Sequence, residues 1–283
     1  MVIFVTSAAE PETNTFMLAF ANAKINLGLY VTEKRPDGYH NLETVFYPVK
    51  IYDVIELTDA ADSSCNIKGI DIPGNPADNI CLKAFHALQK DFNLPEQQIT
   101  LLKNIPVGAG LGGGSSDAAF LVRLANDKFS LGLSAEQMED YVRPLGADCA
   151  FFIQNKPVLA FGKGDEFEPA NIDLSNYYLV LVKPPVHVST VDAYSGIMPA
   201  IPSTSLKDLI HLPLENWKAV LKNDFEETVF VKYPEIEQIK TKLYNAGALY
   251  AAMSGSGSSV FGIFSSAVRL PDLEQDNQVF YGV

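Results

Sequence analysis

The glycine-rich stretch "NIPVGAGLGGGSSDAAF" at residues 104–120 is the part of the chain whose composition points most directly to chemistry. Two serines and an aspartate follow its glycines, and we expect a helix to begin at about Ser115. A glycine-rich turn that runs into a helix leaves backbone N–H groups without partners, and the helix dipole adds partial positive charge there. A phosphate group is the natural ligand of such a turn.

Other interpretations of this loop are weaker. Its glycines fit G-x-G-x-x-G after a strand-like run, as in a dinucleotide-binding turn. The acidic residue that such a turn needs further along would be Glu136, which lies in a helical pattern where Ser134 and Gln137 form a capping box. No G-K-[ST] closes the loop, which excludes a Walker A motif. A flexible turn without a ligand would be costly, because glycine loses the most backbone entropy on folding.

Two further segments carry polar residues in an apolar setting. In "LAFANAKINLGLY" the strand period of two puts Asn22, Lys24 and Asn26 on one face. A lone lysine on a strand is usually solvent-exposed, but the asparagines beside it favour a polar pocket. In "RPLGADCAFF", Asp148 follows a glycine turn and could cap a helix or lie in a cleft, and the spacing does not decide between the two. Cys149 is most simply a core residue.

The composition limits the class of protein. The chain has 283 residues, of which 47% are hydrophobic, and a net charge of -13. This balance gives no basic surplus for a nucleic-acid partner, and no apolar run is long enough to span a membrane. Three cysteines without C-x-x-C spacing fit a cytoplasmic protein. Residues 1–16 lack a signal-peptide pattern, and we expect them to be a disordered or upstream extension outside the fold.

The remaining pattern alternates strands and helices. Residues 18–58 indicate strands joined by the turn "RPDGYH", and "DNICLKAFHALQKDF" indicates a helix capped by Asp78 or Asn79. "YYLVLVKP" indicates a strand, "EIEQIKTKLYNAG" a helix that ends at Gly247, and "YAAMSGSGSSVFGIF" a small-residue turn before a strand. We therefore expect an α+β protein with an N-terminal domain at 17–165 and a C-terminal domain at 166–283.

Three motifs in order resemble the GHMP kinase superfamily, which includes galactokinase, homoserine kinase, mevalonate kinase and phosphomevalonate kinase. "AKINL" looks like the first motif, "PVGAGLGGGSSDAA" like the second and "MSGSGSSVFG" like the third. The resemblance covers nearly all of residues 18–264. It implies a two-domain GHMP kinase fold with a ribosomal protein S5 domain 2-like N-terminal half and a ferredoxin-like C-terminal half. It also implies a left-handed β-α-β crossover, which the residue pattern does not show.

The resemblance also implies roles for single residues. Asp148 would be the general base, Lys24 would orient it and stabilise the nascent alkoxide, and Asp117 would be a dipole partner or cap. ATP would enter with Mg²⁺, for which Ser115 or Ser116 could be a ligand. The residues expected to bind ATP are Pro106, Val107, Gly108, Ala109, Gly110, Leu111, Gly112, Gly113, Gly114, Ser115 and Ser116. The third motif, residues 254–258, would support this loop or be an ordinary tight turn.

"RPDGYH" and "LGADCAFF" are most similar to family members whose substrate is a cytidine diphosphate-linked alcohol. This similarity implies that Tyr39, His40 and Phe46 receive the cytosine by stacking and hydrogen bonding, and that Asn26 also contacts the substrate. "VKPPVHVST" is a candidate for another wall of that pocket. Another GHMP kinase such as homoserine kinase is the nearest alternative, ahead of a dehydrogenase or a nucleotide-binding protein without catalysis.

Overall fold

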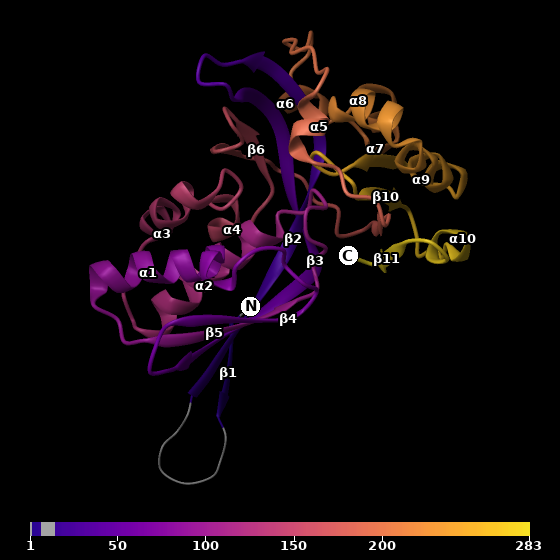
Figure 1. Cartoon of the computed structure of the whole chain (residues 1–283). Coiled ribbons are helices and arrows are strands. Elements are labelled where there is room, and N and C mark those ends of the chain that lie inside the picture. The colour runs from indigo at the N-terminus through magenta and orange to yellow at the C-terminus, as the bar shows by residue number, and fades with distance from the viewer. Residues whose placement is uncertain (1, 7–14) are drawn as a thin grey trace. The chain divides into compact units, whose positions relative to one another are not determined.

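The computed structural model describes residues 2–6 and 15–283, and it divides into two compact units (Figure 1). Unit 1 comprises Met1–Ala23, Ile51–Val107 and Gly112–Asn155, and unit 2 comprises Lys24–Lys50, Gly108–Leu111 and Lys156–Val283. The α+β class and a division in two are confirmed. The units are discontinuous in sequence, which differs from the single boundary expected between residues 165 and 166, because the chain passes repeatedly from one unit to the other.

Two long strands form the start of the fold. β2 (Thr15–Lys34) and β3 (His40–Asp59) contain 20 residues each and are joined by the expected turn, in which the Gly38 N–H donates to the Arg35 carbonyl. β1 (Val2–Thr6) pairs antiparallel with the beginning of β2. Residues 1–16 were expected to be an extension outside the fold, but residues 2–6 are part of the sheet. Residues 1 and 7–14 lie outside the described residues, and residues 15 and 16 belong to β2.

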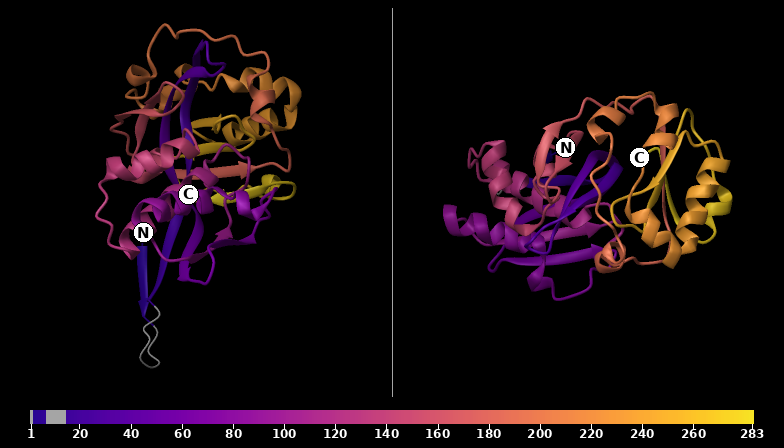
Figure 2. Two further views of the ribbon diagram at one scale, coloured as in Figure 1. Left: turned by 60° about the vertical axis from the view of Figure 1, so that its left-hand side comes forward. Right: turned by 90° about the horizontal axis from the view of Figure 1, so that it is seen from above.

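Unit 1 places helices on one face of a mixed sheet, as Figures 1 and 2 show for α1 and α2 against β4 and β5. β4 (Ser64–Gly69) and β5 (Gln97–Lys103) run parallel and are connected through α1 (Ile80–Phe92). This is a β-α-β crossover, and its left hand stays a prediction. The other elements of the unit are η1 (Pro76–Asp78), α2 (Gly113–Lys128), α3 (Ala135–Val142), η2 (Arg143–Leu145) and α4 (Phe151–Gln154).

Local sequence explains where these helices begin. The Asn79 side chain accepts the Cys81 N–H and caps α1, as one of the two expected caps. In α1 the residues at helical spacing, Cys81, Ala84, Phe85 and Leu88, are buried. The capping box of α3 is also present, since Ser134 and Gln137 satisfy each other's backbone N–H groups.

Unit 2 contains an antiparallel sheet of strand order β11-β8-β10-β9. Its strands are β8 (Tyr178–Lys183), β9 (Tyr250–Met253), β10 (Val260–Phe264) and β11 (Gln278–Tyr281). Helices follow the first and third of these strands, which gives the β-α-β-β-α-β arrangement of a ferredoxin-like half. β6 (Val158–Phe161) pairs with β3 and with β7 (Glu166–Pro169). The helices are α5 (Thr190–Tyr194), α6 (Leu206–Leu209), α7 (Leu214–Val220), α8 (Phe225–Lys232), α9 (Pro234–Asn245) and α10 (Pro271–Glu274).

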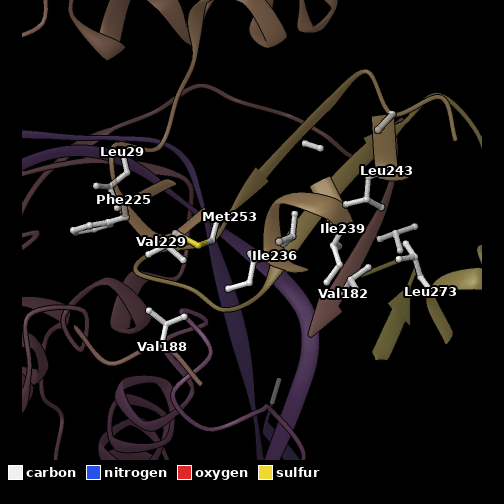
Figure 3. Close-up of a cluster of buried hydrophobic side chains, with 14 of the residues drawn as sticks. Leu29, Val182, Val188, Phe225, Val229, Ile236, Ile239, Leu243, Met253 and Leu273 are labelled. Carbon is white, nitrogen blue, oxygen red and sulfur yellow. The ribbon is translucent and has the colours of Figure 1, made fainter. Parts of the chain in front are cut away.

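The core of unit 2 forms where α8 and α9 pack on this sheet (Figure 3). α9 buries Ile236, Ile239 and Leu243, which recur at helical spacing, and Val182 and Met253 come from the strands. Each fully buried aliphatic side chain of this kind contributes about 1.5–3 kcal/mol. α9 ends before Gly247, which has a φ of +96°. Among the described residues, no helix has the length and apolar character needed to cross a membrane.

Candidate active site

The glycine-rich loop leads directly into α2, which begins at Gly113, two residues earlier than expected. Gly112 is the N-cap, with a left-handed backbone at φ +68°, and no side chain caps the helix. Because a side-chain cap would use one of the N–H groups of the first turn, its absence suits an external acceptor. The loop therefore has the backbone geometry of an anion-binding turn.

The third motif supports this loop from within unit 2. The Ser254 hydroxyl donates to the Gly110 carbonyl at 2.8 Å, and the Ser259 N–H donates to the Ala109 carbonyl at 3.2 Å. Gly110 has a φ of +79°, and a Cβ there would overlap the Ser254 carbonyl oxygen. The supporting contact expected for this motif is thus present. Asn223 in turn fixes the motif, because its amide donates to the carbonyls of Met253 and Gly255 at 2.8 Å each.

Lys24 and Asn26 form a buried polar pair on β2. Their relative exposures are 4% and 2%, and Lys24 Nζ donates to Asn26 Oδ1 at 2.7 Å. The Asn26 amide donates to Thr44 Oγ1 at 2.9 Å, and Lys24 Nζ lies 4.8 Å from the centre of the Phe46 ring. The Lys24 N–H donates to the Leu111 carbonyl at 3.0 Å, which ties this strand to the phosphate loop. Lys24 is thus buried beside polar side chains and is not a solvent-exposed strand residue.

Asn22 makes its hydrogen bonds with a different residue, although the sequence pattern places it on the same strand face as Lys24 and Asn26. It belongs to unit 1, where its side chain exchanges hydrogen bonds with Asn155 at 3.1 and 2.7 Å.

Asp148 lies half-buried in the turn that precedes α4 in unit 1. The N-cap of α4 is Ala150, and the two roles that the sequence left open for Asp148 both stay predictions. The same turn approaches the first turn of α2: a Cβ at Gly146 would lie 3.6 Å from Ser115 Oγ. Burial raises the pKa of the Cys149 thiol to about 11, against a hydrogen bond with Ser115 that lowers it. Asp148 therefore follows a turn that packs against the phosphate-loop helix.

Asp117 is neither an exposed dipole partner nor a cap. Its side chain is 1% exposed, and Lys103 Nζ contacts its Oδ2 at 3.0 Å and also contacts Asp53. Asp53 additionally accepts the N–H groups of Asn104 and Ile105 at 2.5 and 2.8 Å, directly before the loop. Burial raises the pKa of Asp117, against the opposing charge of Lys103. Burial lowers the pKa of Lys103, but the carboxylates of Asp117 and Asp53 outweigh it and the pKa is raised.

The residues expected to receive cytosine lie at two places: Tyr39 and His40 at the start of β3, and Phe46 further along the strand. Tyr39 is 62% exposed, with Lys163 Nζ 5.3 Å from the centre of its ring. The His40 ring stacks on Tyr194 at 4.7 Å, and burial, followed by the charge of Lys34, lowers the pKa of His40. A lowered pKa favours the neutral imidazole, which has one donor and one acceptor nitrogen.

Phe46 lies apart from that group. It is six residues beyond His40 on an extended strand, a separation of about 20 Å, and it is buried beside Lys24 and Phe167. One pyrimidine ring does not span that distance. The rise of the strand therefore separates Phe46 from His40, with which the resemblance grouped it.

Side chains that could hold a metal ion are sparse. Among residues 2–6 and 15–283, no group of three or more His, Cys, Asp or Glu side chains has the arrangement of a metal site. The Ser116 hydroxyl is buried without a hydrogen-bond partner, whereas Ser115 is half-buried at the start of α2. This donor set fits a Mg²⁺ that is carried by nucleotide phosphates and takes few protein ligands.

Sequence reasoning missed several residues of this site. Lys103 resembles any polar residue at the end of a strand, and Asn223 and Tyr194 are more than 25 residues from the groups they contact. No local pattern signals such pairs. The one usable local signal for this buried cluster is the position of Lys103, at the end of an apolar strand directly before the glycine-rich loop.

Comparison with known proteins identifies the class of this fold and site. Residues 79–156 match the family model "GHMP kinases N terminal domain", and residues 197–279 match "GHMP kinases C terminal". The chain belongs to the GHMP kinases, and it is therefore an ATP-dependent small-molecule kinase.

Comparison with individual proteins is more specific than the match to the family. The chain is 54% identical over 262 residues to the 4-diphosphocytidyl-2-C-methyl-D-erythritol kinase of Bacteroides fragilis, which covers 91% of this chain and 96% of that protein. A crystal structure of 4-(cytidine 5'-diphospho)-2C-methyl-D-erythritol kinase superposes with a TM-score of 0.77 at 28% identity, over 94% of this chain and 98% of that one. Homoserine kinase from Cytophaga hutchinsonii gives a TM-score of 0.67 at 16% identity, over 98% and 97%, and shares the fold.

Proposed function

We propose that the protein transfers the γ-phosphoryl group of ATP to the 2-hydroxyl of 4-diphosphocytidyl-2-C-methyl-D-erythritol, a step of non-mevalonate isoprenoid precursor biosynthesis. The observation that carries this proposal is the 54% identity, over 91% of the chain, to a relative with that name. We also propose that the enzyme acts in the cytoplasm, which fits its three free cysteines, Cys65, Cys81 and Cys149.

The layout of unit 2 supports a long substrate. His40 and its stacking partner Tyr194 lie at one end of β3, and Lys24 and Phe46 lie about 20 Å further along. A cytosine placed at His40 would meet an aromatic ring and an imidazole that can donate and accept hydrogen bonds. The diphosphate would then lead towards Lys24, and the alcohol would react near the Lys24–Asn26 pair. In this proposal Phe46 contacts the alcohol end instead of the base.

The chemistry requires a base and a positive charge. Asp148 accepts the proton of the 2-hydroxyl as the oxygen attacks the γ-phosphorus, and the bond to the β,γ-bridging oxygen breaks to release ADP. Lys24 stabilises the negative charge on the attacking oxygen, and its bond to Asn26 holds the ammonium in place. Residues Pro106–Ser116 hold the phosphates through backbone N–H groups. Ser115 or Ser116 would be a protein ligand of Mg²⁺, which would neutralise phosphate charge when bound.

Homoserine phosphorylation is the second candidate, since the solved homoserine kinase shares the fold. The His40–Tyr194 stack favours the cytidine substrate, because a small amino acid offers no ring to an aromatic site.

The test is ADP release by the purified protein with Mg²⁺ and ATP, with 4-diphosphocytidyl-2-C-methyl-D-erythritol, homoserine, mevalonate and galactose compared at equal concentration. Turnover with the first alone supports the proposal. Turnover with another alcohol refutes the substrate but keeps the kinase. His40→Ala should raise the KM of the cytidine substrate at least about tenfold, the value of one good buried contact, and leave the KM of ATP unchanged. The matched control is His86→Ala, an exposed histidine of α1.

A further inference from the structure

The loop between β8 and α5 is held in place by the third motif. The Ser258 hydroxyl donates to the Val186 carbonyl at 2.6 Å, and Lys183 Nζ donates to the same carbonyl at 3.1 Å. These bonds anchor the backbone directly before His187. The sequence made this segment a candidate wall of the cytidine pocket, and that role stays a prediction.

His187 lies over the beginning of the phosphate loop. A Cβ at Gly108 would be 2.7 Å from Cε1 and 3.0 Å from Nδ1 of the imidazole, so the ring rests on the glycine itself. Gly108 has a φ of +62°, and both residues are exposed to solvent. Glycine at position 108 therefore has no side chain to collide with the imidazole ring, and it adopts the left-handed backbone without strain. Both residues belong to unit 2.

We propose that His187 is a nucleotide-binding residue that donates a hydrogen bond to a phosphate oxygen of ATP at the Gly108 end of the loop. This inference rests on the proposed role of residues 106–116 in binding ATP. An imidazole N–H is a donor in either protonation state, and a bond to a charged phosphate is stronger than one between neutral groups. The chain has a net charge of -13 and as a whole does not attract the anionic ATP. A hydrogen-bond donor beside the phosphates supplies that attraction locally.

The exposure of the ring favours binding over packing. A histidine that only filled space would be covered by apolar neighbours, whereas both His187 and Gly108 are exposed to solvent. Two further histidines, His86 and His211, are also exposed and have no place in the proposed site, and either can be replaced as a control.

The experiment is calorimetric titration of the full-length protein with the non-hydrolysable ATP analogue AMP-PNP and Mg²⁺, without an alcohol substrate. Relative to wild type, His187→Ala should raise the Kd about tenfold, as expected for one lost charge-assisted bond. His187→Gln, which keeps a donor, should stay within about threefold of wild type, and His211→Ala should not change the Kd. The KM of the cytidine substrate should be the same in His187→Ala and wild type.

An unchanged Kd in His187→Ala, or a Kd of His187→Gln equal to that of His187→Ala, would overturn the proposal. A raised KM for the cytidine substrate with an unchanged Kd for AMP-PNP would also overturn it, and would return the segment to the cytidine pocket. These outcomes are distinct from failure of the proposed function, which would appear in the wild-type protein as absent turnover or absent nucleotide binding.

Discussion

Replacement of Lys103 by methionine removes the one positive charge from a buried cluster in unit 1. The side chains of Lys103, Asp53 and Asp117 are 2%, 0% and 1% exposed. Methionine has a similar length and apolar volume, so the cavity left behind is small and the loss is mainly electrostatic. We expect Lys103→Met to be among the most destabilising substitutions in the chain.

The expected magnitude follows from the burial of the partners. Removing one member of a buried ion pair costs about 3–5 kcal/mol, because the remaining charge has no compensation. Asp53 would keep its bonds from the Asn104 and Ile105 N–H groups, which places the expected loss nearer the lower value. Since a folded domain is stable by only about 5–15 kcal/mol, the variant should lose a large fraction of its stability.

Denaturant unfolding followed by far-ultraviolet circular dichroism is the appropriate measurement. The only tryptophan, Trp217, lies in unit 2, so its fluorescence does not report directly on the part that contains Lys103. The matched control is Lys207→Met, which removes an exposed lysine paired with an exposed glutamate and should leave the midpoint unchanged.

A second variant separates charge from packing. Lys103→Met combined with Asp53→Asn removes the lysine charge and the carboxylate charge of one of its two partners, and the asparagine keeps an Oδ1 acceptor for the two backbone N–H groups. The double variant should therefore be more stable than Lys103→Met alone, because the effects of paired residues are not additive. The reasoning fails if Lys103→Met unfolds within about 1 kcal/mol of wild type, or if the double variant is less stable than the single one.

Three further outcomes can be checked independently. Because burial raises the pKa of Asp117 in the folded state, its contribution to stability is lost as pH rises from the ordinary carboxyl value through the raised one. Asp117→Asn should therefore gain stability relative to wild type as pH rises above the ordinary carboxyl value, and a constant difference in denaturation midpoint would contradict this. Gly110→Ala should lower the melting temperature, because the left-handed backbone alone costs about 1–2 kcal/mol and the new Cβ overlaps a carbonyl oxygen. Gly114→Ala should not lower it, because nothing lies within 4 Å of its Cβ. Equal losses of melting temperature in the two variants would refute the argument. Asp148→Asn and Lys24→Met should each reduce kcat by about 100-fold or more with the Kd of AMP-PNP unchanged, and near-normal turnover would remove that residue from the mechanism.

Elements set by short-range pattern could be predicted from the sequence. The strand period around Lys24, the capping box at Ser134 and the stop at Gly247 each depend on residues within a few positions of one another, and each is found as expected. The same holds for the turn "RPDGYH" and for the glycine-rich turn that leads into α2; its binding of phosphate stays a prediction. Sequence analysis thus predicted the elements that depend on residues close to one another in the chain.

Pairs formed by strand register could not be predicted. Lys103 and Asp53 are 50 residues apart and meet because β3 and β5 pair with Val54 opposite Leu102. A shift of one residue in that register would turn the lysine to the other face of the sheet. His40 and Tyr194 likewise meet only after the chain has returned from the other unit. The information for these contacts lies in the packing of whole elements, which a local pattern does not contain.

The glycine-rich loop shows why a correct motif still leaves its parts unexplained. A single cause, close approach of the backbone to a phosphate, was enough to predict the loop, but the structure gives its glycines different reasons. Gly110 is required by the protein itself, because the Ser254 carbonyl occupies the place of its Cβ, and at Gly113 a Cβ would lie 2.8 Å from Lys103 Nζ. Gly108 makes room for His187, while Gly114 has free space around it. Substitution of these four glycines one at a time therefore probes three different contacts and one position with free space. At Gly114 a new Cβ would meet no protein atom, so a loss of ATP binding there would be due to the nucleotide.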